Sequence, residues 1–298
     1  MEKINVAVVG WGNVGKQAVK AVNAAPDMEL VGVVRRSVSG DSARAGHVRA
    51  VEDIKELGKV DIALLCTPTR AVEEEASKYL AMGISTVDSF DIHSGIVDLR
   101  GKLGPIAKAN GVVSVVAAGW DPGSDSVVRT LMEAMSPGGI TYTDFGPGMS
   151  MGHSVVARSV AGVADALSLT IPLGTGVHRR LVYVQLKEGA SFEKVEADIK
   201  TDPYFRHDET RVMQVDDVQA LVDMGHGVSM SRKGVSGQTH NQMLQFNMRI
   251  NNPALTSQVM ASCARACKRL PPGCYTMIEI PVVDLLPGER EGHIHRLV

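Results

Sequence analysis

Residues 6–15 read VAVVGWGNVG, and residues 16–22 continue as KQAVKAV. A short apolar run leads into the pattern G-x-G-x-x-G, which leads into a segment with the apolar spacing of a helix. Gly10 is expected to allow a tight turn, Gly12 to let backbone amides approach a pyrophosphate, and Gly15 to let the helix pack on the strand. This order of strand, glycine turn and helix therefore predicts a dinucleotide-binding unit.

Length, composition and charge limit the classes of function. The chain has 298 residues, which predicts two domains, and its hydrophobic content of 44% and charged content of 21% are typical of a globular protein. A net charge of −2 favours neither nucleic acid nor an anionic membrane, so the expected partner is a small molecule. No apolar run approaches the ~18 residues of a membrane span, and the start of the chain does not resemble a secretory signal. We expect a cytoplasmic protein.

The cysteines and the C-terminal histidines do not form the spacing of a metal site. The four cysteines are Cys66, Cys263, Cys267 and Cys274, and we expect reduced, structural thiols. His293 and His295 form an H-x-H pattern, which we expect in an exposed tail. We therefore assign no metal.

A second strand, expected at residues 29–34, ends at Arg35, Arg36 and Ser37. An NAD-specific site would place Asp or Glu here to accept a hydrogen bond from the ribose 2′-hydroxyl. Two arginines suit a 2′-phosphate, because a guanidinium stays charged and binds phosphate in a bidentate manner. The sequence thus predicts NADP, and an ordinary solvated charge pair is the alternative.

Further strands are expected at residues 60–66, 84–88 and 112–117, with a helix at 71–82. Asp91 and Asp121 both follow the carboxyl end of a strand, where open α/β sheets bind ligands. Thr67 and Thr69 follow another strand and are expected to bind the nicotinamide half. The predicted cofactor-binding residues are Gly10, Trp11, Gly12, Asn13, Val14, Gly15, Arg35, Arg36, Cys66, Thr67, Pro68, Thr69, Ser89, Phe90, Asp91, Ala118, Gly119, Asp121 and Pro122.

The alternation of strands and helices weakens near residue 138. A strand at 138–145 is expected to precede a glycine-rich loop at 146–154, whose backbone N–H groups face a ligand. A mostly antiparallel sheet is then predicted from strands at 167–173, 177–186, 211–215, 227–231 and 238–250, with helices at 192–200 and 216–223. A last helix, at 254–270, is expected to return to the first domain.

The predicted fold class is thus α/β, with a Rossmann-type doubly wound parallel sheet and a second α+β domain for substrate binding and dimerisation. The dinucleotide-binding domain is expected to span residues 1–118, with 253–298 packing back onto it. The second domain is expected to span 119–252.

Residues 119–123 (GWDPG) and 145–154 (FGPGMSMGHS) closely resemble the meso-diaminopimelate dehydrogenases. The resemblance runs over nearly the whole chain and includes residues 10–15, residues 88–91 (DSFD) and Asn252 with Pro253. It implies an NADP-dependent homodimer in lysine biosynthesis, which oxidises the D-centre of meso-2,6-diaminopimelate to L-2-amino-6-oxopimelate and ammonium. The reverse reaction is a reductive amination, and other D-amino acids are possible further substrates.

The resemblance also implies roles for individual residues. Asp91 and Asp121 would lie by the reacting amine, and Arg180 would help to hold the distal carboxylate. The substrate-binding residues that it implies are Asp91, Trp120, Asp121, Phe145, Met151, Gly152, Thr170, Arg180, His226 and Asn252. Because the amine must lose a proton before hydride leaves Cα, a general base is required. Asp91, Asp121 and His153 are the catalytic candidates, and the sequence does not decide among them.

Several of these assignments have simpler alternatives. Thr170 also fits ordinary strand material, Arg180 an exposed basic run, and His226 a turn. The chain departs from the family pattern by a short segment at 172–177 and by Met151 where Gln is frequent, and both changes affect substrate selectivity more than reaction type. The remaining alternatives for function are another NADPH-dependent reductase of lysine-pathway dicarboxylates and a non-catalytic NADPH-binding sensor.

Overall fold

The computed structural model describes residues 3–37, 44–45, 48–222 and 225–298. The chain divides into two compact units, each described here by itself. Unit 1 comprises Met1–Thr130 and Pro253–Val298, and unit 2 comprises Leu131–Asn252. Residues 119–130 group with unit 1 although the sequence analysis placed them in the second domain. A Cβ atom added at Gly119 would lie 3.7 Å from Ser89 and 3.9 Å from Thr256, both in unit 1.

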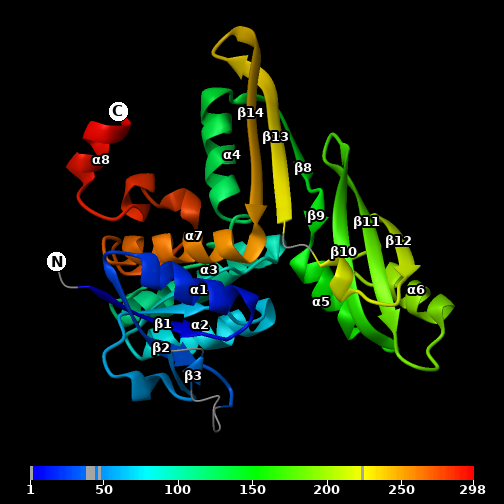
Figure 1. Ribbon diagram of the computed structural model, residues 1–298. Coiled ribbons are helices and arrows are strands. Elements are labelled where there is room, and N and C mark those ends of the chain that lie inside the picture. Colours follow the sequence, from blue (N-terminus) through cyan, green and yellow to red (C-terminus); the bar gives the residue numbers. More distant parts are fainter. Residues whose placement is uncertain (1–2, 38–43, 46–47, 223–224) are drawn as a thin grey trace. The chain divides into compact units, whose positions relative to one another are not determined.

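Unit 1 contains a Rossmann-type sheet, which confirms the predicted fold class (Figure 1). Its strand order is β15-β7-β6-β5-β1-β2-β4-β3. The bounds are β1 (Ile4–Val9), β2 (Met28–Val34), β3 (Arg44–Ala45), β4 (Val48–Val51), β5 (Ile62–Leu65), β6 (Ser85–Asp88), β7 (Val113–Val115) and β15 (Gly273–Tyr275). The paired strands are parallel apart from β3 and β4. The strand order reverses at β1, which places a ligand-binding crevice beyond its carboxyl end.

Helices cover both faces of this sheet. Alternate residues of β1 explain why: Val6 and Val8 pack in one apolar cluster, and Ala7 and Val9 pack in another. The first cluster includes side chains of α1 (Asn13–Ala24) and α7 (Asn252–Cys267). The second includes side chains of α2 (Val72–Ala81) and α3 (Ile96–Ala109). The sheet is therefore buried on both sides, and its strand ends are left for ligands.

The C-terminal segment belongs to unit 1. Strand β15 pairs with β7 in parallel, and Arg265 of α7 donates to both carboxylate oxygens of Asp27, at 2.7 and 2.8 Å. The cysteines are free thiols. The expectation of an exposed tail is wrong for His293, because this residue lies in α8 (Arg290–Leu297) and is only 9% exposed.

Unit 2 contains two sheets, whereas the sequence predicted one. The first has the order β14-β13-β8, from β8 (Gly138–Phe145), β13 (Gly225–Ser236) and β14 (Thr239–Asn251), and all its pairs are antiparallel. The second has the order β12-β11-β10-β9, from β9 (Gly148–Met149), β10 (Val163–Gly174), β11 (Val177–Leu186) and β12 (Glu209–Gln214). In the second sheet β11 and β12 run parallel, and the other pairs are antiparallel.

Glycines allow the chain to pass from the first sheet to the second. Gly146 has φ of +94°, and a Cβ atom there would collide with the carbonyl oxygen of Thr170. Gly148 has φ of +156°, and its Cβ atom would collide with the carbonyl oxygen of Gly225. The prediction of a loop at 146–154 is only partly right. This segment also contains β9 and the start of a helix, α5 (Met151–Ser159).

Helices of unit 2 differ from expectation at one place. Helix α6 (Phe192–Thr201) lies where it was predicted, and Ser191 caps it by accepting the N–H of Lys194 at 3.3 Å. The helix predicted at 216–223 is wrong over the described residues, which form only a short 3-10 turn at Gln219–Leu221; residue 223 lies outside them. Helix α4 (Ser124–Met135) begins in unit 1 and ends in unit 2. Within the described residues no helix is long and apolar enough to span a membrane.

Candidate active site

The glycine turn after β1 has the geometry that a pyrophosphate requires. Gly10 has φ of +104°, and a Cβ atom there would collide with the carbonyl oxygen of Cys66. A Cβ atom at Gly15 would collide with the carbonyl oxygen of Gly10, so the turn and the helix need both glycines. At Gly12, the N-cap of α1, an added Cβ atom meets nothing within 4 Å. The start of α1 therefore leaves open space beside backbone N–H groups that favour an anion.

Arg35 and Arg36 follow β2 directly. The backbone N–H of Arg35 donates to the carbonyl of Val51 at 2.9 Å, which fixes the end of the strand beside β4. Arg36 and Ser37 are exposed, and Arg35 is half-buried. Because β1 and β2 are parallel, Arg35 and Arg36 lie at the same end of the strands as the glycine turn.

The remaining predicted cofactor residues follow the carboxyl ends of β5, β6 and β7. Since these strands are parallel, the three loops meet at one edge of the sheet. Thr69 donates from its hydroxyl to the carboxylate of Asp91 at 2.6 Å, so the loop after β5 is tied to the loop after β6. Asp91 is exposed.

Asp88, which the sequence analysis did not single out, holds the loops after β6 and β7. One oxygen of its buried carboxyl accepts the N–H groups of Phe90, at 2.9 Å, and of Ala117, at 3.1 Å. The N–H of Ala118 donates to its main-chain carbonyl at 2.7 Å. Burial raises the pKa of Asp88 to about 6, although these backbone donors favour the ionised form.

The GWDPG turn follows β7 and carries Trp120 and Asp121. Gly123 has φ of +147°, and a Cβ atom there would collide with the carbonyl oxygen of Gly119, so the turn closes only with glycine at this position. The N–H of Ser124 donates to the same carbonyl at 3.1 Å. Trp120 is 6% exposed, and the side chain of Asp121 is 16% exposed.

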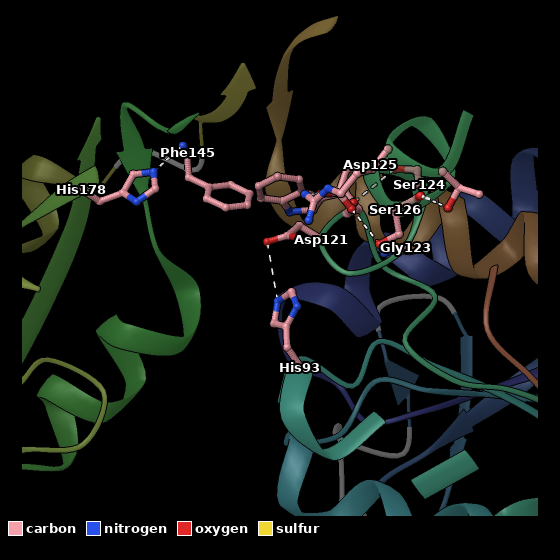
Figure 2. A network of polar contacts seen from close by, with 11 residues as sticks. His93, Asp121, Gly123, Ser124, Asp125, Ser126, Phe145 and His178 are labelled. Carbon is pink, nitrogen blue, oxygen red and sulfur yellow. Dashed lines mark hydrogen bonds and ion pairs between the residues drawn. The ribbon is translucent and has the colours of Figure 1, made fainter. Parts of the chain in front are cut away.

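Charged groups surround Asp121 within unit 1. Its carboxylate lies 3.9 Å from Nε2 of His93. Figure 2 marks this contact with a dashed line. Burial raises the pKa of Asp121, and the negative charge of Asp91 acts in the same direction. A hydrogen bond with Asp125 and the positive charge of Arg129 act to lower it. Asp121 is therefore a partly desolvated carboxylate beside a second acid, as a proton acceptor at an amine requires.

Unit 2 carries the predicted cation. Arg180 of β11 faces Thr170 of β10 in the strand register and donates from Nη1 to its hydroxyl. Its Nε donates to the carboxylate of Asp208 at 2.6 Å. Thr170 is buried, and the side chain of Arg180 is 15% exposed. For Nη2 of Arg180 there is no hydrogen-bond acceptor among the described residues, which leaves this nitrogen for a ligand.

Histidines lie near this guanidinium. His226 is buried, and its Nδ1 lies 2.8 Å from the backbone nitrogen of Gly227. Burial lowers the pKa values of His226 and His178, and the charge of Arg180 lowers them further. Nε2 of His178 accepts the N–H of Phe145 at 2.7 Å, which is drawn in Figure 2. The imidazoles therefore stay neutral beside the charged guanidinium.

His153 is engaged at both ring nitrogens. Nε2 lies 2.9 Å from the carbonyl oxygen of Tyr204, which accepts and so requires a proton on Nε2. Nδ1 then accepts the hydroxyl of Ser150, at 2.8 Å. Burial and the charge of Arg180 lower the pKa of His153 to about 4. A ring with this pKa and these partners is poorly suited to act as a base near neutral pH.

The other predicted substrate residues begin or end elements. Phe145 ends β8, and Met151 and Gly152 form the first turn of α5. Asn252 is the first residue of α7. Within the segment at 172–177, Thr175 and Gly176 form a tight turn between β10 and β11, with left-handed φ of +54° at Thr175.

Together, a Rossmann-type domain and acids at its strand ends define a dinucleotide-dependent oxidoreductase. Residues 4–87 match the oxidoreductase family with an NAD-binding Rossmann fold, and residues 119–177 match the diaminopimelic acid dehydrogenase C-terminal domain. The chain is 60% identical to meso-diaminopimelate D-dehydrogenase of Bacteroides fragilis, over 100% of both chains. It therefore belongs to the meso-diaminopimelate D-dehydrogenase family, as its motifs predicted.

Solved structures agree with this assignment. The DAP dehydrogenase of C. glutamicum in complex with DAP has a TM-score of 0.91 and 30% identity, over 100% of both chains. An engineered D-amino acid dehydrogenase bound to NADP+ has a TM-score of 0.88 and 28% identity, over 99% of this chain and 100% of the other.

Proposed function

We propose that the protein catalyses the reversible, NADP-dependent oxidative deamination of the D-centre of meso-2,6-diaminopimelate. The substrate, NADP+ and water give L-2-amino-6-oxopimelate, ammonium, NADPH and a proton. The observation that carries this proposal is that the chain presents both kinds of charged group: unit 1 has acids at its strand ends, and unit 2 has a partly open guanidinium. A substrate with amines and carboxylates needs both kinds of group.

The residues present fit NADP. Gly12 leaves the space that a pyrophosphate would occupy, and Arg35 and Arg36 provide guanidiniums for a 2′-phosphate. When bound, NADP+ accepts the hydride from the D-centre Cα. The residues at the ends of β5, β6 and β7 would orient its nicotinamide half, and an engineered relative bound to NADP+ supports the choice of cofactor.

Asp121 is our choice for the general base, because burial raises the pKa of its carboxyl toward the range of a useful proton acceptor. Asp91, whose carboxylate Thr69 orients, would bind the ammonium group and hold it beside Asp121. His153 is the weaker candidate, since its pKa lies at about 4 and its ring nitrogens have partners within unit 2.

Arg180 would bind the distal carboxylate through Nη2, with Thr170 and Asp208 fixing the plane of its guanidinium. His226 would add a neutral imidazole, and Asn252 would contact the distal L-amine. The carboxylate next to the reacting amine would meet Trp120, Phe145 and the backbone at Met151 and Gly152. A homodimer formed through unit 2, which the resemblance implies, and the cytoplasmic location expected from the sequence belong to the same proposal.

The test compares the stereoisomers of diaminopimelate. Purified protein is mixed with NADP+ and the meso or the LL isomer, and formation of NADPH is followed by its absorbance. The meso isomer should be oxidised with stoichiometric release of ammonium, and the LL isomer should not. Equal rates with both isomers would refute the proposal. Reduction of an unsaturated dicarboxylate without ammonium would indicate the pathway reductase instead, and NADPH binding without turnover would indicate a sensor.

A further inference from the structure

Asp208 is the acid that pairs with Arg180 in unit 2, and no sequence pattern marks it. Its Oδ2 accepts a hydrogen bond from Nε of Arg180 at 2.6 Å. The side chain of Asp208 is 26% exposed, and that of Arg180 is 15% exposed. Among the described residues no hydrogen-bond donor contacts the other oxygen of Asp208, Oδ1. The cation and the anion therefore lie together, and each keeps one polar atom for a ligand, Nη2 and Oδ1.

The segment between α6 and β12 holds Asp208 in place. The N–H of Asp208 donates to the carbonyl of Phe205 at 3.0 Å, and Phe205 is buried in an apolar cluster with side chains of β10, β11 and β12. His153 of α5 donates from Nε2 to the carbonyl of Tyr204 at 2.9 Å. Contacts other than its ion pair therefore fix the position of Asp208 beside β11.

The position of Asp208 limits what Arg180 can bind. In a guanidinium, the Nε–H bond and one N–H bond of Nη2 point toward the same edge. A carboxylate that binds Nη2 at this edge therefore lies next to the Asp208 carboxylate. Two neighbouring carboxylates repel each other, and Asp208 also offsets the positive charge of the guanidinium. A simple carboxylate thus suits this pair less well than it would suit a lone arginine.

The imidazoles near the pair do not change this balance of charge. Burial lowers the pKa values of His153, His178 and His226, so these rings stay neutral near pH 7. The charges of Arg180 and Asp208 shift the pKa of His178 in opposite directions, as two opposite charges close to one ring should. The pair therefore presents one positive and one negative charge side by side, with neutral rings around them.

The distal L-centre of the proposed substrate has the complementary arrangement of charge, because one carbon atom carries both its ammonium and its carboxylate. We propose that Asp208 is a specificity-determining residue: Nη2 of Arg180 binds the distal carboxylate, and Oδ1 of Asp208 accepts a hydrogen bond from the distal ammonium. The pair thereby selects an amino acid end over a simple carboxylate, which Asp208 repels. This role rests on the proposed function, which places the distal end of the substrate at Arg180. It gives the L-amine a charged partner in addition to the neutral amide of Asn252.

The test uses two compounds that differ only at the L-centre. D-2-aminopimelate has the D-centre amine and both carboxylates of meso-diaminopimelate but lacks the L-amine. Its affinity is measured as an inhibition constant against oxidation of meso-diaminopimelate, which gives a value whether or not the compound is itself oxidised. Asp208→Asn keeps an acceptor for Nε of Arg180 and removes the negative charge. KM for meso-diaminopimelate should rise by about tenfold, and the inhibition constant of D-2-aminopimelate should stay the same or fall.

Two further variants distinguish selection of the ligand from mere support of Arg180. Thr170→Val removes the acceptor of Nη1 and leaves Asp208 in place, so it should weaken both compounds by the same factor, because both carry the distal carboxylate. Glu209→Gln is the matched control: it removes an acid at the next position, which pairs with Arg179 at 2.9 Å, and should change neither affinity. If Asp208→Asn weakens both compounds equally, as expected for Thr170→Val, Asp208 only orients Arg180 and the inference is wrong.

A measurement on the unmodified protein covers the case in which Asp208→Asn does not fold. Calorimetric titration of the protein with NADPH bound should show meso-diaminopimelate binding roughly tenfold more tightly than D-2-aminopimelate. Equal affinities of the two compounds would overturn the inference while leaving the proposed reaction intact. No formation of NADPH from meso-diaminopimelate and NADP+ would instead refute the proposed function, and the role of Asp208 with it.

Discussion

The strand-end loops of unit 1 and the β10–β11 pair of unit 2 both bury titratable groups, and burial changes their charge in opposite directions. In unit 1 it raises the pKa of Asp88 to about 6 and that of Asp125 to about 7, which favours protonated acids. In unit 2 it lowers the pKa values of the histidines near Arg180, that of His153 to about 4. Each region thus limits its own charge, and the groups that stay charged include Asp121, which suits an amine, and Arg180, which suits a carboxylate.

The largest effect is expected from removing the negative charge that unit 1 retains at Asp121. Asp121→Asn keeps the size of the side chain but cannot accept the amine proton, so kcat should fall by roughly 10²- to 10⁴-fold. Steady-state kinetics with meso-diaminopimelate measures the loss, and the exposed Asp98→Asn in α3 is the matched control. A decrease of less than about fivefold would mean that another group accepts the proton.

The next test concerns Asp88, a buried acid for which we propose no role in proton transfer. The folded-state pKa of Asp88 lies above its ordinary value, so the folded protein holds a proton that the unfolded chain has already lost. The stability of the unmodified protein relative to Asp88→Asn should therefore fall as pH rises from about 4 to about 7, by roughly 3 kcal/mol. Urea unfolding at both pH values measures this difference. A constant difference between the two proteins would show that Asp88 is ionised throughout.

The retained charge of unit 2 is tested by Arg180→Ala. Loss of a charge-assisted hydrogen bond should raise KM for meso-diaminopimelate by about 10- to 100-fold while NADP+ affinity is unchanged. Arg179→Ala is the matched control, because Arg179 is the residue next to Arg180 in β11. It pairs with Glu209 of β12 at 2.9 Å. If both substitutions raise KM by the same factor, Arg180 does not bind the distal carboxylate of the substrate.

The smallest effect is expected at the cofactor. Replacing both Arg35 and Arg36 with Ala should weaken NADP+ binding by about tenfold and leave NAD+ binding nearly unchanged, because only NADP+ carries the 2′-phosphate. Fluorescence titration with both dinucleotides measures the preference. If both affinities fall together, the arginines support the fold of the loop and do not select the phosphate.

The sequence predicts most reliably the features that depend on near neighbours. Gly10, Gly12 and Gly15 were interpretable because they stand at fixed spacing between an apolar run and a helical pattern in one stretch of sequence. Asp91 and Asp121 could be placed at one sheet edge because parallel strands end on the same side. Neither the glycines nor the two acids identify the reaction, which only the family resemblance implies.

Features that depend on distant packing were missed. In the sequence, Asp125 and Arg129 look like an ordinary exposed pair at positions i and i+4 of a helix, because nothing local reveals the complete burial of the carboxyl. The division of unit 2 into two sheets was missed for a similar reason, since it depends on what surrounds Gly146 and Gly148 in space. The sequence pattern predicts His293 in an exposed tail, whereas this residue lies in α8 and is buried.

The most direct test of the central claim follows the hydrogen that leaves the substrate. Meso-diaminopimelate carrying deuterium only at the D-centre Cα, or only at the L-centre Cα, is oxidised with NADP+, and the reduced cofactor is analysed by mass spectrometry. The proposed function predicts deuterium in NADPH from the D-labelled substrate alone. Deuterium transfer from the L-labelled substrate, or none from either, would contradict it.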